Sequence, residues 1–222
     1  MDYKKIIPIF ALIIAFTLFV GVATENKFNY AQVIFIDVGQ GDAIHIRTED
    51  GQNVLVDGGG SIKYNIGKKT LKPYFLKNNT KCLDMAIATH LHVDHYKGVT
   101  ELSNCYKIKK LYVFDGNNVS SAYYLKKGDK IIFSKDEWIE ILWPPKAENI
   151  NIAQEDENMS SLIIKVILKD FSILITGDLG EEGEKLLLKE YKGTDKLKCD
   201  ILKVGHHGSK TSTNKEIINI LN

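Results

Sequence analysis

The stretch from Thr89 to His95 reads Thr-His-Leu-His-Val-Asp-His and directly follows the apolar run from Leu83 to Ala88. It places three histidines and one carboxylate within six positions, although the 222-residue chain has only six histidines. Five of the six fall in two clusters, the second being the pair His206 and His207. A packed apolar core does not need imidazoles in this arrangement, whereas a metal site at a strand end does. The sequence therefore predicts a metal centre.

Length and composition predict one sizeable globular domain. Hydrophobic residues make up 44% and charged residues 26% of the chain, and the formal net charge is +1. Such a charge gives no global basic field for nucleic acid, and the lysine-rich stretches 63–81, 107–110 and 126–130 are either local patches or solvated faces. The three cysteines form no Cys-x-x-Cys pair, which argues against a cysteine-based zinc site.

The N-terminus has the pattern of an export signal. Lys4 and Lys5 precede an apolar stretch of about 18 residues, a length on the border between a cleaved signal peptide and a membrane-spanning helix. Because positive residues stay on the cytoplasmic side, either form places the rest of the chain outside the membrane, secreted or on the extracellular face of a bacterial membrane. We expect a signal peptide or anchor over 1–24, a linker over 25–30 and the folded domain over 31–222.

Short apolar runs between turn residues predict a mixed α+β domain. Strands are expected over 32–38, 43–47, 53–57, 83–88, 109–114, 137–143, 161–168, 171–176 and 198–204. Helices are expected over about 68–78, after Gly98, and over about 181–191 and 213–221. Strands that arrive in runs with helices between them predict stacked sheets flanked by helices.

The chemistry of the first histidine cluster favours one or two divalent ions, zinc or manganese, with no organic cofactor. Alternate residues of an extended loop point the same way, so His90 and His92 can reach one ion together. Asp94 and His95 then lie on the following turn and can reach a second ion.

Further strand ends supply matching groups. Asp178, after Thr-Gly, can bridge two ions or cap the helix that follows. One histidine of the pair His206 and His207 can complete the second ion, and the other can donate a proton or hold an oxyanion. Asp57, before three glycines, either orients a liganding histidine through its ring N–H or is a turn carboxylate.

At this point the residues resemble a known family, the metallo-β-lactamase fold, and most closely the hydrolase domain of the ComEC/Rec2 competence proteins. The matching strings are Phe35–Ala43 (FIDVGQGDA), Val56–Gly59 (VDGG), Thr89–His95, Asn158-x-x-Ser161-Leu162, Thr176–Leu179 (TGDL) and Leu202–Ser212 (LKVGHHGSKTS). The resemblance implies a four-layer αββα sandwich with the metals at the edge of the sheets.

The resemblance also implies roles for individual residues. The implied metal ligands are His90 and His92 on one ion, Asp94 and His95 on the other, Asp178 as bridge, and His207 as the last ligand. His207 is favoured because it precedes Gly-Ser. Asp94 and His206 are the expected catalytic groups, and Asn158 and Ser161 are expected to contact substrate oxygens.

Three departures from the family pattern matter. The wider fold uses a further histidine before the bridging aspartate, but none occurs between His95 and His206, so the first ion would be weakly held, completed by solvent or absent. The competence proteins carry a large transmembrane channel, whereas this chain has at most one span. The family's domain usually continues through another strand and helix, so we expect a sequence truncated at its C-terminus, with an exposed sheet edge.

These features favour an exported or membrane-anchored metal-dependent hydrolase, in which the ion activates a water for attack on a phosphodiester or another ester. By resemblance the substrate is DNA, and the partners are the membrane and a competence or uptake machinery. Two alternatives stay open. One is an acyl-bond hydrolase of lactams or lactones, against which the missing histidine counts. The other is a non-catalytic domain that binds DNA or a partner, against which the intact first motif counts.

Overall fold

The computed structural model describes residues 10, 12–15, 30–145 and 157–220. The predicted export segment and linker lie almost entirely outside these residues. Within the part of the chain that is described, no helix has the length and apolar character needed to cross a bilayer.

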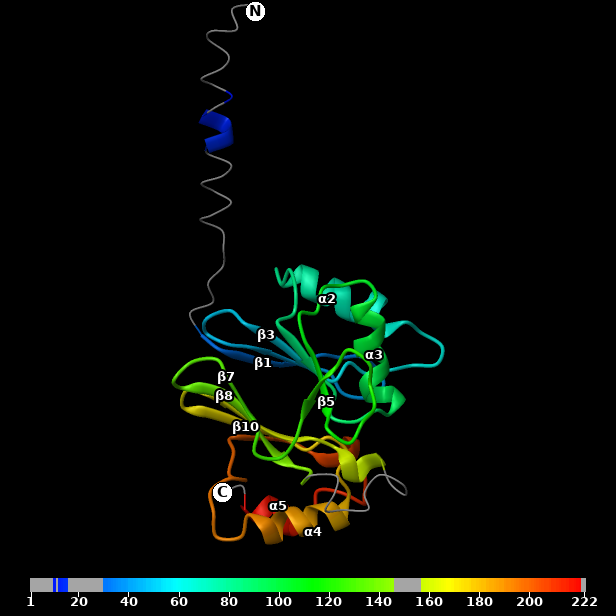
Figure 1. Ribbon diagram of the computed structural model, residues 1–222, viewed down its shortest axis with the longest axis vertical. Coiled ribbons are helices and arrows are strands. Elements are labelled where there is room, and N and C mark those ends of the chain that lie inside the picture. Colours follow the sequence, from blue (N-terminus) through cyan, green and yellow to red (C-terminus); the bar gives the residue numbers. More distant parts are fainter. Residues whose placement is uncertain (1–9, 11, 16–29, 146–156, 221–222) are drawn as a thin grey trace, which may run out of the picture.

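Two β-sheets lie face to face (Figure 1). The six strands of the first sheet are, in spatial order, β1 (Gln32–Phe35), β2 (Ile44–Arg47), β3 (Asn53–Val56), β4 (Met85–Ile87), β5 (Leu111–Phe114) and β6 (Tyr123–Leu125). The five strands of the second are β11 (Ile201–Lys203), β10 (Phe171–Ile175), β9 (Ile163–Leu168), β8 (Glu137–Trp143) and β7 (Lys130–Ile132). Strands β3 to β6 are parallel, as are β10 and β11, and the other neighbours are antiparallel.

Helices cover the outer face of each sheet (Figure 1). The π-helical turn Gly67–Leu71 (η1) continues into α2 (Lys72–Lys77), and together with α3 (Val93–Ser103) it covers the first sheet. Helices α4 (Glu181–Glu190) and α5 (Lys215–Ile220) cover the second. Three buried apolar clusters, one between the sheets and one under each helical layer, hold the four layers together. The predicted αββα sandwich is confirmed.

Most predicted strands are present but shorter than expected, because residues at one or both predicted ends are not part of the strand. The stretch 137–143 is a strand over its whole predicted length, and the predicted hairpin at Lys169-Asp170 joins β9 to β10. The sequence reasoning missed β6 and β7, which have three residues each and lie at the far edges of the two sheets.

The helix expected after Gly98 begins earlier, so that prediction was wrong in its position. Helix α3 starts at Val93, and Asp94 and His95 lie in its first turn rather than on a loop. Gly98 is a packing position, because a Cβ there would lie 1.9 Å from the Gly58 carbonyl oxygen. The absence of a side chain lets α3 lie directly on the glycine run after β3.

A network of buried polar side chains surrounds His45 on β2 in the first sheet. His45 on β2 is fully buried, and its ring nitrogens contact Tyr74 Oη and Asn53 Oδ1, each at 3.0 Å. Burial is the main reason that the pKa of His45 falls from 6.5 to about 4. The folded protein therefore holds this imidazole neutral.

This depressed pKa predicts acid sensitivity of the fold. The unfolded chain binds the His45 proton more tightly, so stability present above pH 6.5 is lost as the pH falls towards 4, by about 3 kcal/mol in all. Urea unfolding near pH 7.5 and near pH 4.5 should show that wild type loses about 2–3 kcal/mol more than His45→Gln. Equal losses in the two proteins would contradict this role for His45.

Candidate metal centre

Strand topology brings the predicted site residues to one edge of the sandwich. In the first sheet β3 and β4 are parallel, so Asp57 and the segment Thr89–His95 follow strands that end on the same side. In the second sheet β10 and β11 are parallel, so Asp178 and the pair 206–207 also follow neighbouring strand ends. A backbone hydrogen bond of 3.1 Å from His206 N to Gly177 O joins these two tips.

Asp57 holds the first half of the site together. Its carboxylate accepts hydrogen bonds from Thr89 N at 2.7 Å and from Thr89 Oγ1 at 2.8 Å, and it contacts His95 Nδ1 at 2.9 Å. With Nδ1 engaged in this way, His95 presents Nε2 to the centre of the site. This is the contact expected of a carboxylate that orients a metal-binding histidine.

Four ligand atoms converge at the centre. Asp42, His95, Asp178 and His207 each offer one, and all four atoms lie within 4.8 Å of one another. His95 Nε2 lies 3.2 Å from Asp178 Oδ1 and 3.3 Å from His207 Nε2. Three of the four are predicted ligands. The fourth, Asp42, was not predicted.

Asp42 and Lys203 are the site residues that sequence reasoning missed. Asp42 Oδ1 lies 3.5 Å from His207 Nδ1, and its other oxygen is in close contact with Lys203 Nζ. Lys203 is buried and also donates to Gly177 O at 2.9 Å. Both carried a signal: Asp42 closes the Gly-Gln-Gly-Asp turn inside one of the matching strings, and Lys203 is a charge within an otherwise apolar strand.

Asp178 lies near His207, His90 and His206, as a carboxylate that bridges two ions would. Its Oδ2 lies 3.4 Å from His207 Nε2, 4.0 Å from His90 Nε2 and 3.9 Å from His206 Nε2. His90 Nε2 in turn contacts His92 Nδ1 at 3.1 Å. A second ion on His90 and His92 stays a prediction.

The remaining predicted residues surround this centre. Asp94 Oδ2 lies 3.4 Å from His207 Nε2 and accepts a 3.3 Å hydrogen bond from Gln40 Nε2. Ser161 is buried, and its Oγ accepts the Asp178 backbone N–H at 3.1 Å. Asn158 lies in the short helix Glu157–Ser160 (η4), where its carbonyl oxygen accepts from Ser161 N. Substrate contacts by Asn158 and Ser161 stay predictions.

Carboxylates dominate the electrostatics of the site. Burial alone would lower the pKa of His95, but the charges of Asp57 and Asp178 outweigh it and raise that pKa to about 10. Burial beside this positive charge lowers the pKa of His90 to about 3. The His95 charge also holds the pKa of Asp57, Asp94 and Asp178 low despite burial. The carboxylates therefore favour a positive charge at the centre. Without a metal ion, the protonated ring of His95 provides that charge.

Three of the seven non-glycine residues with positive φ in the described part of the chain are site residues. Asp57, His206 and His207 have φ angles of 58°, 44° and 52°, in the left-handed region that residues with side chains rarely occupy. Such conformations cost about 1–3 kcal/mol each and persist where surrounding contacts enforce them, often at functional sites.

The residues present fit a divalent ion. Two imidazoles and two carboxylates form the four-ligand N/O set that zinc and manganese accept. A liganding histidine must be neutral, so a cation that binds His95 Nε2 displaces its proton. The hydrogen-bond partner on Nδ1 is already in place.

Comparison with known proteins agrees with this fold. The family model described as the metallo-beta-lactamase superfamily matches residues 36–134. Relatives include ComE operon protein 3 of Bacillus subtilis, 31% identical over 215 residues that cover 84% of this chain and 26% of that protein. Competence protein ComA of Neisseria gonorrhoeae is 27% identical over 195 residues, with coverage of 86% and 26%.

The chain contains a domain of the metallo-beta-lactamase superfamily, matched over residues 36–134. Members of this superfamily are typically metal-dependent hydrolases, which is the predicted class of enzyme. The chain spans about a quarter of the length of the curated relatives that it matches.

Solved structures of the superfamily share the fold. A Cronobacter sakazakii metallo-beta-lactamase with a HARLDQ motif superposes with a TM-score of 0.55 at 10% identity, covering 77% of this chain and 76% of that one. The subclass B3 metallo-beta-lactamase BJP-1 of Bradyrhizobium japonicum gives 0.53 at 14% identity, covering 78% and 74%. At such low identity, the likeness extends to the architecture alone.

The position of Asp42 predicts a direct effect on metal binding. Asp42→Asn replaces a charged ligand atom of the group of four, so the affinity for zinc or manganese should fall by at least about tenfold, as it does on loss of even an outer-shell partner. Competition with a chromophoric chelator measures this affinity. The matched control is Asp37→Asn, which removes an exposed carboxylate from the same turn. Equal affinities in the two variants would exclude Asp42 as a ligand.

Proposed function

We propose that this chain is a metal-dependent phosphodiesterase that cleaves DNA at the outer face of the cell membrane. The observation that carries the proposal is the group Asp42, His95, Asp178 and His207, with Asp94 beside it. The names of the relatives, a competence protein and a ComE operon protein, support DNA as the substrate and uptake machinery as the setting. The apolar, lysine-flanked N-terminal segment supports membrane attachment or export.

In this proposal the residues of the chain divide the chemistry between them. A divalent ion in the centre would polarise a phosphoryl oxygen and lower the pKa of a nearby water. Asp94 is partly exposed, and an aspartate carboxylate is ordinarily ionised at neutral pH, so Asp94 can accept a proton from the attacking water. His206 has an exposed ring edge near Asp178 and can donate a proton to the leaving oxygen.

Lys203 reduces the electrostatic repulsion between the centre and an anionic substrate. Its ammonium group contacts Asp42 and lies 3.8 Å from Asp178 Oδ1. It therefore offsets part of the carboxylate charge that would otherwise repel a phosphodiester. This lysine favours phosphodiester cleavage over the acyl-bond alternative, as does the absence of a histidine between His95 and His206.

The test is metal-dependent cleavage of a labelled single-stranded oligonucleotide by the full chain in detergent. Activity should appear with zinc or manganese and disappear with a chelator. His207→Ala removes a ligand and should lower kcat/KM by at least about 100-fold, the upper end of the effect of losing an outer-shell partner. The control His45→Gln removes a buried histidine outside the site, and circular dichroism verifies its fold.

Other outcomes decide between the alternatives. Hydrolysis of a lactam or lactone without cleavage of DNA would support an acyl-bond hydrolase. Metal binding and DNA binding without any hydrolysis would support a non-catalytic domain. Cleavage that His207→Ala leaves intact would contradict the proposed centre.

A further inference from the structure

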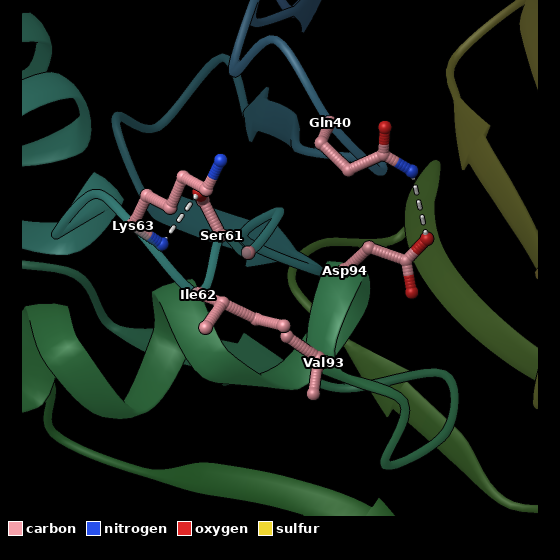
Figure 2. Close-up of a pocket in the computed structure, with 7 residues that line it drawn as sticks. Gln40, Ser61, Ile62, Lys63, Val93 and Asp94 are labelled. Carbon is pink, nitrogen blue, oxygen red and sulfur yellow. Dashed lines mark hydrogen bonds between the residues drawn. The ribbon is translucent and has the colours of Figure 1, made fainter.

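A cavity of about 450 Å³ opens beside the metal centre (Figure 2). Its lining includes Gln40, Ser61, Ile62, Lys63, Val93 and Asp94. Figure 2 shows the hydrogen-bonded pair Gln40 and Asp94 on one side, with Ser61, Ile62 and Lys63 on the other. Because Asp94 also contacts the ring of His207, a molecule in this cavity would lie next to the reacting groups.

The wall of the cavity exposes apolar side chains. Ile62 is 89% exposed and Val93 is 50% exposed, and Tyr64, which follows the lining residue Lys63 in the chain, is 44% exposed. Apolar groups gathered on a surface beside an active centre mark a contact site more often than isolated ones do.

The segment that forms this wall is also the basic part of the chain. From Gly58 to Leu83 it contains six lysines and no acidic residue, whereas the whole chain has a net charge of +1. Outside this segment the net charge is therefore −5. Lys63, Lys68 and Lys69 are exposed, and Lys69 Nζ lies 5.0 Å from the centre of the Tyr64 ring.

We propose that this cavity and the adjacent residues 62–69, together the lysine groove, bind a single nucleic-acid strand and lead it to the metal centre. This inference rests on the proposed function and deepens it. A single strand offers unstacked bases for Ile62, Tyr64 and Val93, and phosphates for the lysines. A small acyl substrate at the metal centre would be too short to contact lysines that extend away from that centre.

The first experiment measures binding without cleavage. The full chain in detergent is titrated into a fluorescein-labelled single-stranded oligonucleotide with a chelator present. The variant Lys63→Gln/Lys68→Gln/Lys69→Gln should raise the Kd at least tenfold. Three lost phosphate contacts should also reduce the slope of log Kd against log salt concentration by about 2.

The matched control is Lys107→Gln/Lys135→Gln/Lys189→Gln, which removes the same charge from exposed positions outside the groove. Its Kd should change less than twofold to threefold. An equal loss in both triple variants would overturn the proposal, because binding would then follow net charge alone.

A second variant separates stacking from charge. Tyr64→Ala should raise the Kd about tenfold without changing the salt slope, because stacking on an aromatic ring carries no counterions. A Kd equal to that of wild type would remove Tyr64 from the groove. A duplex of the same sequence should bind more weakly than the single strand, and equal binding would contradict a single-strand groove.

The results also separate this inference from the proposed function. Binding that depends on the groove lysines, without hydrolysis under any metal, would leave the groove standing and the hydrolase excluded. Metal-dependent DNA cleavage with normal binding by the lysine variant would leave the hydrolase standing and the groove excluded. If the lysine variant loses affinity for phosphatidylserine vesicles but keeps it for the oligonucleotide, the surface serves the membrane and the groove proposal fails.

Discussion

The hydrogen bonds of Asp57 are the interaction on which the rest of the site depends. One carboxylate ties the end of β3 to Thr89 at the end of β4 and to His95 in the first turn of α3. Its backbone takes up the left-handed conformation needed to place the carboxylate there. Gly58 and Gly98 then meet without side chains, so the helix that carries His95 can approach closely. The position of the His95 imidazole thus depends on one buried residue, which also contributes to its charge.

The second sheet completes the centre and adds a positive charge to it. It supplies Asp178 and His207 as ligand atoms, and Lys203 as a fixed positive charge between two carboxylates. A centre with four nearby aspartates would otherwise be too negative for an anionic substrate. The same principle operates on a larger scale outside the centre, because the stretch Gly58–Leu83 beside the cavity carries six lysines, whereas the rest of the chain has a net negative charge.

Sequence patterns predicted the stacked sheets because each central strand is an apolar run bounded by turn residues. They pointed to Asp178 and the pair His206 and His207 because these follow such runs, and only the family resemblance favoured His207 of the pair. The start of α3 was missed since Gly98 looked like a boundary, whereas it is a contact between helix and loop. Asp42 and Lys203 join the site only through tertiary packing, which local patterns do not contain. The edge strand Tyr123–Leu125 has only three residues, which is too short for a strand period to be recognised in the sequence.

The four ligand atoms come from both halves of the sandwich, two from segments around the first sheet and two from the tips of the second. A bound ion would therefore be a cross-link between the two halves, joining positions that are far apart along the chain. Closing long loops is the most effective way for a cross-link to restrict an unfolded polypeptide. The supply of metal would then determine the stability of the folded domain as well as its activity. A chain without its ion would unfold more often and would be the one most exposed to proteolysis.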